Sequence, residues 1–328
     1  MIKKTPKKRA PTKTSPFGTS GRINHDSTAY YSRSMQPKLY KKTSYDLVNE
    51  QILPTEIVNK IHCTTSENMS EIPNGSIHLM ITSPPYNVGK EYDKDLSTEE
   101  YTSLIQKVLF ETYRVLIDGG RAAVNVANLG RKPYIPLHRL IIELAYKANF
   151  EMRGEIIWNK SAGSGVSTAW GSWMSASNPT LRDIHEYILV FQKPPFGRKT
   201  STKQPSTISK EQFLEYTKSV WSFPPQSAKK VSHPAPFPVE LPKRLIQLYS
   251  FKGDIVLDPF MGVGSTAIAA LESDRKYIGY EISEKYVKLA MQRINSFESD
   301  ILLTQKLNPK RTNLRGNLNQ KKDAAKNR

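Results

Sequence analysis

The chain has 328 residues, 38% of them hydrophobic, which is enough to bury a core in one or two domains. No apolar run approaches the roughly 18–20 residues of a membrane span, and the basic N-terminus lacks the apolar stretch of a secretory signal. The single cysteine excludes a disulfide framework and a cysteine-based zinc site, and the six histidines show no metal-ligand spacing. These features predict a cytoplasmic protein without a bound metal.

The formal net charge of +18 is unevenly distributed along the chain. Residues 1–44 carry 11 Lys or Arg and one acid, residues 301–328 carry eight and one, and residues 45–300 are close to balanced. Basic tails favour a polyanionic partner such as DNA. Solvated, disordered tails are the alternative, and the two interpretations are compatible because disordered basic arms bind phosphates without sequence preference.

Residues 1–44 are rich in Lys, Pro, Thr and Ser without periodicity, which predicts a disordered arm before a domain at 45–300. In that domain a short apolar run, 78–82, predicts a strand. Ser97 and Glu100 form a capping box that starts a helix, which we expect to end at Gly119-Gly120. A second helix is expected at 137–148, and further strands at 121–126, 152–158 and 185–191.

Residues 193–232 are dominated by Pro, Lys, Ser and Thr and lack clear periodicity, so we interpret them as an insertion outside the core. The alternation then resumes, with strands expected at 255–258 and 275–282 and helices at 238–249, 265–273 and 284–297. Strands that alternate with helices predict an α/β fold with a mainly parallel sheet. A second basic tail follows at 301–328.

The stretch Asp258-Pro-Phe-Met-Gly-Val-Gly-Ser-Thr266 joins a predicted strand to a helix that Ser265 could cap. Gly262 and Gly264 allow a tight turn and close approach of a ligand. Glu281 follows about 20 residues later at a strand end, where a carboxylate can accept hydrogen bonds from ribose hydroxyls. A turn without a ligand is the structural alternative, which the succession of strand, glycines, helix, strand and terminal acid disfavours. A dinucleotide site is the functional alternative, because Gly262 to Ala267 fit G-x-G-x-x-A, whereas a phosphate loop is excluded because no Gly-Lys-Ser/Thr follows.

The stretch Thr82-Ser-Pro-Pro-Tyr86 directly follows an apolar strand and suits a flat heterocycle that carries an amino group. The amino lone pair of cytosine or adenine is delocalised into the ring, so an enzyme must reorient it by accepting both N–H hydrogens. The Ser83 hydroxyl and the Pro84 carbonyl can accept them, and consecutive prolines hold the acceptors in place. Tyr86 can stack on the base. A Pro-Pro turn with a packed tyrosine is the structural alternative.

Together, and in this order, the two stretches resemble the β-class amino-methylating DNA methyltransferases of restriction–modification systems. The resemblance covers about residues 50–300 and implies a Rossmann-like methyltransferase fold with a mixed, mainly parallel sheet. It implies S-adenosyl-L-methionine as cofactor and double-stranded DNA as substrate, with a flipped-out target base. The expected catalytic residues are Ser83, Pro84, Pro85 and Tyr86. The expected cofactor-binding residues are Asp258, Pro259, Phe260, Gly262, Gly264, Ser265, Thr266 and Glu281.

The same resemblance places target recognition in the insertion at 193–232 and suggests a cognate restriction endonuclease as functional partner. Serine at position 83 usually accompanies methylation of cytosine N4, and adenine N6 is the alternative. Where many relatives carry Gly-Asp-Ser, with the acid near the cofactor adenine, this chain has Cys63-Thr-Thr-Ser-Glu67. Either Glu67 substitutes for that acid or no acid is needed. We expect Cys63 to be a small apolar filler at a strand end rather than a nucleophile. A non-catalytic DNA-binding relative is the remaining alternative of another class.

Overall fold

The computed structural model describes residues 50–86, 96–130, 133–160, 171–198, 205–226 and 237–307, with side chains in the last helix as far as residue 301. These residues belong to one compact unit, Leu47–Arg328. The predicted arm at 1–44 and most of the predicted tail lie outside the described residues.

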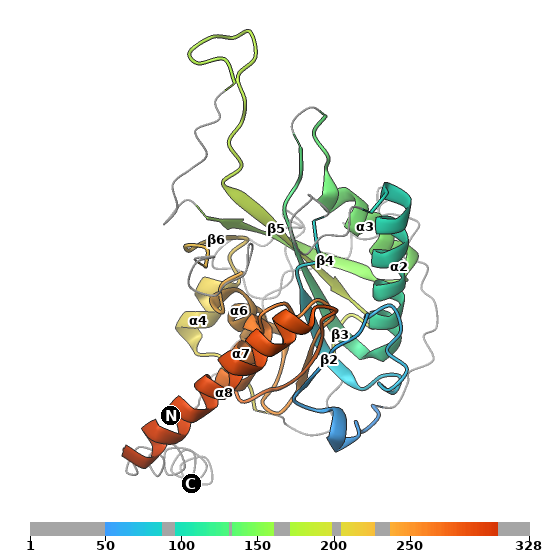
Figure 1. Cartoon of the computed structure of the whole chain (residues 1–328), viewed down its shortest axis with the longest axis vertical. Coiled ribbons are helices and arrows are strands. Elements are labelled where there is room, and N and C mark those ends of the chain that lie inside the picture. The colour runs from blue at the N-terminus through green and yellow to red at the C-terminus, as the bar shows by residue number, and fades with distance from the viewer. Residues whose placement is uncertain are drawn as a thin grey trace, which may run out of the picture. The chain divides into compact units, whose positions relative to one another are not determined.

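Within the described residues, eight strands form one sheet in the order β1-β8-β7-β2-β3-β5-β4-β6. Figure 1 shows this sheet together with the helices that pack against it. Among the described strands, β5 alone runs antiparallel to its neighbours, β3 and β4, and every other ladder is parallel. The mixed, mainly parallel sheet expected from the sequence is therefore confirmed. The strands are β1 Lys60–His62, β2 Ile77–Thr82, β3 Leu116–Val126, β4 Glu151–Asn159, β5 His185–Gln192, β6 Val220–Ser222, β7 Ile255–Asp258 and β8 Lys276–Tyr280.

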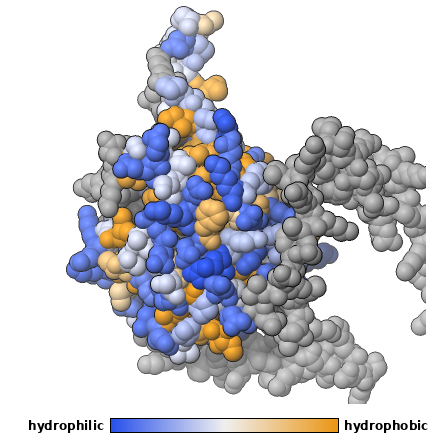
Figure 2. All heavy atoms as spheres, turned by 90° about the vertical axis from the view of Figure 1, so that its right-hand side faces the viewer, coloured by the Kyte–Doolittle hydropathy of each residue, from blue (hydrophilic) through white to orange (hydrophobic). Residues whose placement is uncertain are grey.

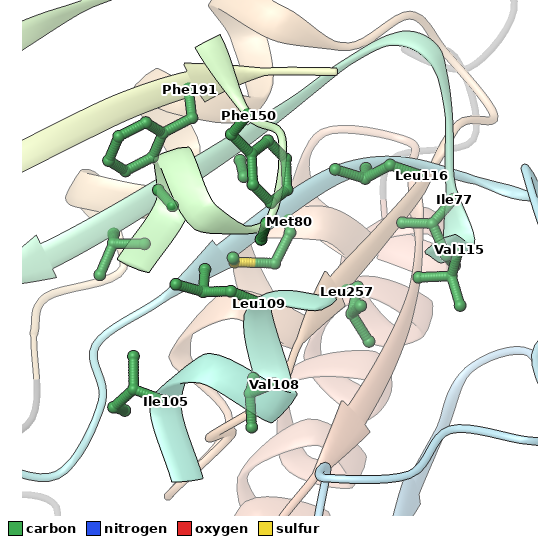
Figure 3. Packing of buried hydrophobic residues seen from close by; sticks show 14 of the residues in the cluster. Ile77, Met80, Ile105, Val108, Leu109, Val115, Leu116, Phe150, Phe191 and Leu257 are labelled. Atoms are coloured by element: carbon green, nitrogen blue, oxygen red, sulfur yellow. The ribbon is translucent and has the colours of Figure 1, made fainter. Parts of the chain in front are cut away.

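Helices cover both faces of the sheet. Successive residues of a strand point to opposite faces, so the apolar residues of one strand pack against helices on both sides. In β2, Met80 packs into a cluster with the apolar faces of α2 and α3 (Figure 3), whereas Leu79 and Ile81 pack with α6 and α7. Every residue of β2 is buried, as expected for a parallel strand with both faces covered. The helices are η1 Thr55–Ile57, α2 Thr98–Val115, α3 Leu137–Lys147, α4 Lys210–Tyr216, α6 Glu240–Tyr249, α7 Ser265–Glu272 and α8 Glu284–Leu307.

The surface over α2 and α3 is mostly polar, with apolar residues in small separate groups (Figure 2). A solvated outer face is typical of amphipathic helices that bury one stripe in a core. None of the described helices combines the length and the apolar character required to cross a membrane.

The helix α2 ends at Val115, and β3 begins at the next residue, so Gly119 and Gly120 lie inside a strand rather than at a helix end. Gly119 has a positive φ of 76°, and a Cβ there would lie 2.7 Å from the backbone of Arg198. Its amide donates to the Lys193 carbonyl at 3.0 Å. The glycine pair therefore permits close passage of another chain segment, and the prediction that it stops the helix is wrong.

Part of the predicted insertion at 193–232 belongs to the core. The strand β6 pairs in parallel with β4, and Trp221 is fully buried beside Tyr216 and Phe223. The Trp158 indole donates to the Phe223 carbonyl at 3.0 Å. Only three residues form β6, too few for a recognisable alternation, which explains why the sequence pattern missed it. At the other end of the chain, α8 continues to Leu307, seven residues into the predicted tail.

Candidate functional site

A cavity of about 560 Å³ opens at the carboxyl ends of the parallel strands β1, β2, β7 and β8. In open α/β sheets, ligands bind at this edge because the loops there converge and the helices that follow begin there. Its walls come from the loops after these four strands, from α2, from the first turns of α7 and α8, and from the segments before α2 and α6. They are lined by Thr64, Thr65, Ser66, Glu67, Ser83, Pro84, Pro85, Tyr86, Leu96, Glu100, Ser103, Leu104, Lys107, Phe237, Pro259, Phe260, Met261, Gly262, Val263, Ser265, Glu281, Ile282 and Tyr286.

The cavity brings the two motifs of the sequence together. All four predicted catalytic residues line it, as do five of the eight predicted cofactor-binding residues, namely Pro259, Phe260, Gly262, Ser265 and Glu281. Asp258, Gly264 and Thr266 are not among the lining residues. The roles of all these residues remain predictions, but the spatial meeting of the motifs is a property of the fold.

The motifs meet because the strands that carry them are neighbours. β2 and β7 pair in parallel through Leu79 with Val256 and Met80 with Leu257. Ser83 follows the last residue of β2, and the glycine-containing loop follows Asp258, the last residue of β7. Parallel strands that end side by side deliver both loops to the same edge.

Asp258 is completely buried and accepts three hydrogen bonds from the protein. The hydroxyls of Thr82 and Thr266 donate to it at 2.7 and 2.6 Å, and the Phe260 amide donates at 3.1 Å. Burial raises the pKa of its carboxyl to about 6, although the hydrogen bonds oppose that shift. Asp258 and Thr266 thus brace the loop from behind the cavity wall.

Glu281 faces the cavity from the end of β8 while both of its carboxylate oxygens accept backbone hydrogen bonds. The amides of Gly262 and Ser283 donate to them at 2.9 Å each. Burial raises the pKa of this carboxyl, and the two amide donors partly offset the effect. A fixed carboxylate in this position retains lone pairs that can accept hydroxyl protons from a ligand.

Gly264 has a positive φ of 83° and serves as the N-cap of α7 without a side-chain hydrogen bond. A Cβ at this position would lie 3.1 Å from the Cβ of Ala290 in α8. The glycine is therefore needed for helix packing, while Ser265 is the first residue of α7 and not its cap. The prediction of a serine cap is wrong because the glycine takes that position.

The Ser83 hydroxyl lies 3.2 Å from the Tyr86 hydroxyl, and both residues line the cavity. The Tyr86 hydroxyl in turn donates to Glu186 at 3.4 Å. Burial and the nearby Glu186 charge raise the pKa of Tyr86 well above its ordinary value. Tyr86 therefore keeps its proton at neutral pH and acts as a donor rather than a base.

Sequence reasoning missed Asn125, Lys160 and Glu186, which meet behind Tyr86. Asn125 lies near the end of β3, Lys160 directly follows β4, and Glu186 lies near the start of β5. A charged residue at the end of a strand could have marked Lys160 and Glu186 as candidates. Their meeting with Asn125 could not be foreseen, because it depends on the pairing of these three strands.

A further wall comes from α2, which sequence reasoning missed because no motif marks its residues, and from the loop after β1, where Glu67 was a candidate. Glu67, the candidate substitute acid, lines the cavity and pairs with Lys107 of α2 at 3.0 Å. Arg114 donates to the carbonyls of Met69 and Ile72 at 2.8 Å each and so fixes this loop to α2. Cys63 directly follows β1, as expected, but it is exposed, so the expectation that it fills apolar space is wrong.

No group of three or more His, Cys, Asp or Glu side chains suited to a metal ion occurs among the residues that the structure describes.

Comparison with known proteins adds a family to this geometry. Residues 77–292 match the family model N6_N4_Mtase, described as DNA methylase. The chain is 30% identical over 280 residues to the Type II methyltransferase M.MjaI of Methanocaldococcus jannaschii, covering 72% of this chain and 91% of that protein. It is 27% identical over 266 residues to the DNA adenine methyltransferase YhdJ of Escherichia coli, covering 74% and 85%.

A solved structure has the same fold. TTHA0409 of Thermus thermophilus, a putative DNA modification methylase complexed with S-adenosyl-L-methionine, is 30% identical and superposes with a TM-score of 0.60. The match covers 73% of this chain and 94% of that one.

Proposed function

The chain belongs to the N6_N4_Mtase family of DNA methylases, and on that premise we propose that it methylates the exocyclic N4 of cytosine in double-stranded DNA. The observation that carries the proposal is the shared cavity, which Ser83, Pro84 and Tyr86 line together with the loop that contains Gly262. A methyl group can pass directly between two ligands only when both are held in one continuous space.

The cofactor is S-adenosyl-L-methionine, which supplies an electrophilic methyl group on a sulfonium sulfur. The residues present suit it. Glu281 offers carboxylate lone pairs for ribose hydroxyls, Gly262 exposes backbone beside it, and Phe260 and Ile282 provide apolar lining. The cavity volume of about 560 Å³ lies within the usual range for pockets that bind small molecules and cofactors.

At the target base, the Ser83 hydroxyl oxygen and the Pro84 carbonyl accept the two amino hydrogens and turn the nitrogen lone pair toward the methyl donor. Serine is too weak a base to remove a proton first, so orientation and charge stabilisation are its contribution. Tyr86 offers its ring to the base, a contact worth roughly 1–3 kcal/mol. The base must leave the duplex to reach these groups.

Serine at position 83 supports cytosine N4 as the acceptor. Similarity to the adenine methyltransferase YhdJ supports the second candidate, adenine N6, because both amines present the same two hydrogens to the same acceptors. Mass spectrometry of nucleosides from DNA of expressing cells distinguishes them. N4-methylcytosine is the expected product, N6-methyladenine would establish the alternative, and the absence of both would refute the proposal.

The matched variants for this assay are Ser83→Ala and Ser296→Ala. We expect the first to lower methyl transfer roughly 100-fold while DNA affinity stays within about twofold, since the lost contact orients the amine rather than binding the duplex. Ser296 is exposed on α8 and should tolerate the same change. Equal activity in the two variants would remove Ser83 from the mechanism.

The proposal has further parts. The basic segments at 1–44, 193–232 and 301–328 contact DNA, and the segment at 193–232 recognises the target sequence. The protein acts in the cytoplasm and protects DNA against a cognate restriction endonuclease. The net charge of +18 supports the contact with DNA.

A further inference from the structure

The carboxylate of Glu186 lies behind Tyr86 and is 13% exposed. Its Oε1 accepts from the Lys160 ammonium at 2.7 Å. Its Oε2 accepts from the Asn125 amide at 2.6 Å and from the Tyr86 hydroxyl at 3.4 Å. Glu186 does not line the cavity, so any effect on the reaction must pass through one of these neighbours.

The direction of the hydrogen bonds follows from the chemistry of the groups. An ionised carboxylate has no proton to give, so the Tyr86 O–H must donate to Glu186. The amide nitrogen of Asn125, 3.4 Å from the Tyr86 oxygen, is also a donor. Once its only proton points to Glu186, the Tyr86 oxygen can interact with Ser83 only as an acceptor.

Ser83 must then donate its hydroxyl proton to Tyr86 across the 3.2 Å contact. This leaves the lone pairs of the Ser83 oxygen directed to the cavity. The amino group of the target base presents N–H donors, so it needs acceptors there. With the opposite direction of bonding, the Ser83 O–H would face the amine and the two donors would oppose each other.

We propose that Glu186 is a positioning residue that acts through Tyr86 to direct the Ser83 lone pairs at the substrate amine. Lys160 pairs with the Glu186 charge, which would be costly to bury alone. This inference rests on the proposed function, because it assumes an amine as acceptor of the methyl group, but it holds for cytosine and adenine alike.

The first test is Glu186→Gln in the full chain. The Lys160 ammonium faces Oε1 and, being charged, attracts the glutamine oxygen more strongly than the neutral Asn125 amide at Oε2 does. The glutamine NH₂ therefore faces Tyr86 and reverses the direction of bonding, while Asn125 can turn its Oδ1, unpaired within the described residues, toward that NH₂. We expect kcat to fall roughly 10- to 100-fold, the effect of one misdirected hydrogen bond at the reacting group, with KM for both substrates within about twofold. Glu155→Gln, an exposed site on the adjacent strand β4, is the matched control and should behave as wild type.

The second test is rescue. In the double variant Glu186→Gln/Lys160→Met the glutamine is free to turn its oxygen to Tyr86, so kcat should recover several-fold over Glu186→Gln alone. The double variant also removes the ammonium that has lost its carboxylate, so it remains informative if the single variant folds poorly. A purely structural role for Glu186 predicts the opposite, since a second core change would lower activity further.

The third test places Glu186→Gln in a Tyr86→Phe background, where the connecting hydroxyl is absent. We expect it to change kcat by less than about threefold there, because the path to Ser83 is broken. Additive losses, or a double variant slower than Glu186→Gln, would overturn the inference while leaving methylation by the wild type intact. An inactive wild type would overturn the proposed function and this inference together.

Discussion

The Thr82 hydroxyl donates a hydrogen bond of 2.7 Å to Asp258, which lies 176 positions later in the chain. Each residue is the last of its strand, so this buried contact joins the point where the Ser83–Tyr86 loop leaves β2 to the point where the glycine-containing loop leaves β7. Because Asp258 also binds Thr266 and Phe260, a single carboxylate fixes the spacing of the two loops.

Replacing Asp258 with Asn should remove a pH dependence of stability. The folded-state pKa of about 6 lies above the ordinary 3.8, so the wild type gains stability relative to the variant below about pH 4 and loses that gain as pH rises through about 6. The shift corresponds to at most about 3 kcal/mol. Urea unfolding of both proteins at about pH 4 and about pH 7.5 measures it, and a wild-type advantage that grows with pH would contradict the assignment.

Glu281→Gln should weaken S-adenosyl-L-methionine binding roughly 10- to 100-fold, because a hydrogen bond to a charged acceptor is worth about 1.5–3 kcal/mol. Isothermal titration calorimetry measures the affinity. Glu284→Gln, three residues on and 80% exposed at its side chain, is the control and should bind the cofactor normally. Unchanged affinity in Glu281→Gln would exclude the carboxylate from the cofactor site.

Gly264→Ala should destabilise the protein more than Gly253→Ala does. The two glycines have almost the same φ, 83° and 84°, so both variants incur the same left-handed penalty of about 1–2 kcal/mol. Only at 264 does a Cβ meet α8, at 3.1 Å from Ala290, whereas it meets nothing within 4 Å at 253. The difference in unfolding free energy, about 1–3 kcal/mol, isolates the packing contribution. Equal losses would show that α8 can move aside.

Trp221→Ala should cost about 3–5 kcal/mol of unfolding free energy, since the side chain is fully buried and its indole donates to the Tyr216 carbonyl at 3.1 Å. The adjacent Val220 is 53% exposed, so Val220→Ala should cost less than about 1 kcal/mol. A small loss for Trp221→Ala would mean that α4 and β6 attach loosely to the sheet.

The sequence predicts the helices and strands of this protein well wherever one apolar period persists. The spacing of Ile105, Val108 and Leu109 identifies α2, and these residues lie in the core. The motifs also predict that both loops follow strand ends, where open α/β sheets bind ligands. That β2 and β7 are neighbours is known only from the pairing of Leu79 with Val256.

Features that depend on lateral contacts could not be predicted. Gly119 looks like a helix stop until Arg198 is seen beside it, and Glu186 looks like an ordinary strand residue until β5 is paired with β3 and β4. Gly264 belongs to a sequence motif typical of ligand binding, but its missing side chain is required by close packing against Ala290. In each case the partner lies too far along the chain for any local pattern to reveal it.

The strand order interleaves the two ends of the chain. β1, from the beginning of the described residues, pairs with β8 at one edge of the sheet, and β6, from the second half, pairs with β4 at the other. A polypeptide cut between residues 199 and 204 would yield two fragments. The first would hold β1, the edge strand that pairs with β8 of the second, and the second would hold β6, the edge strand that pairs with β4 of the first. Neither fragment could complete this sheet alone, so the segment that carries Ser83 and the segment that carries Gly262 are not separable folding units.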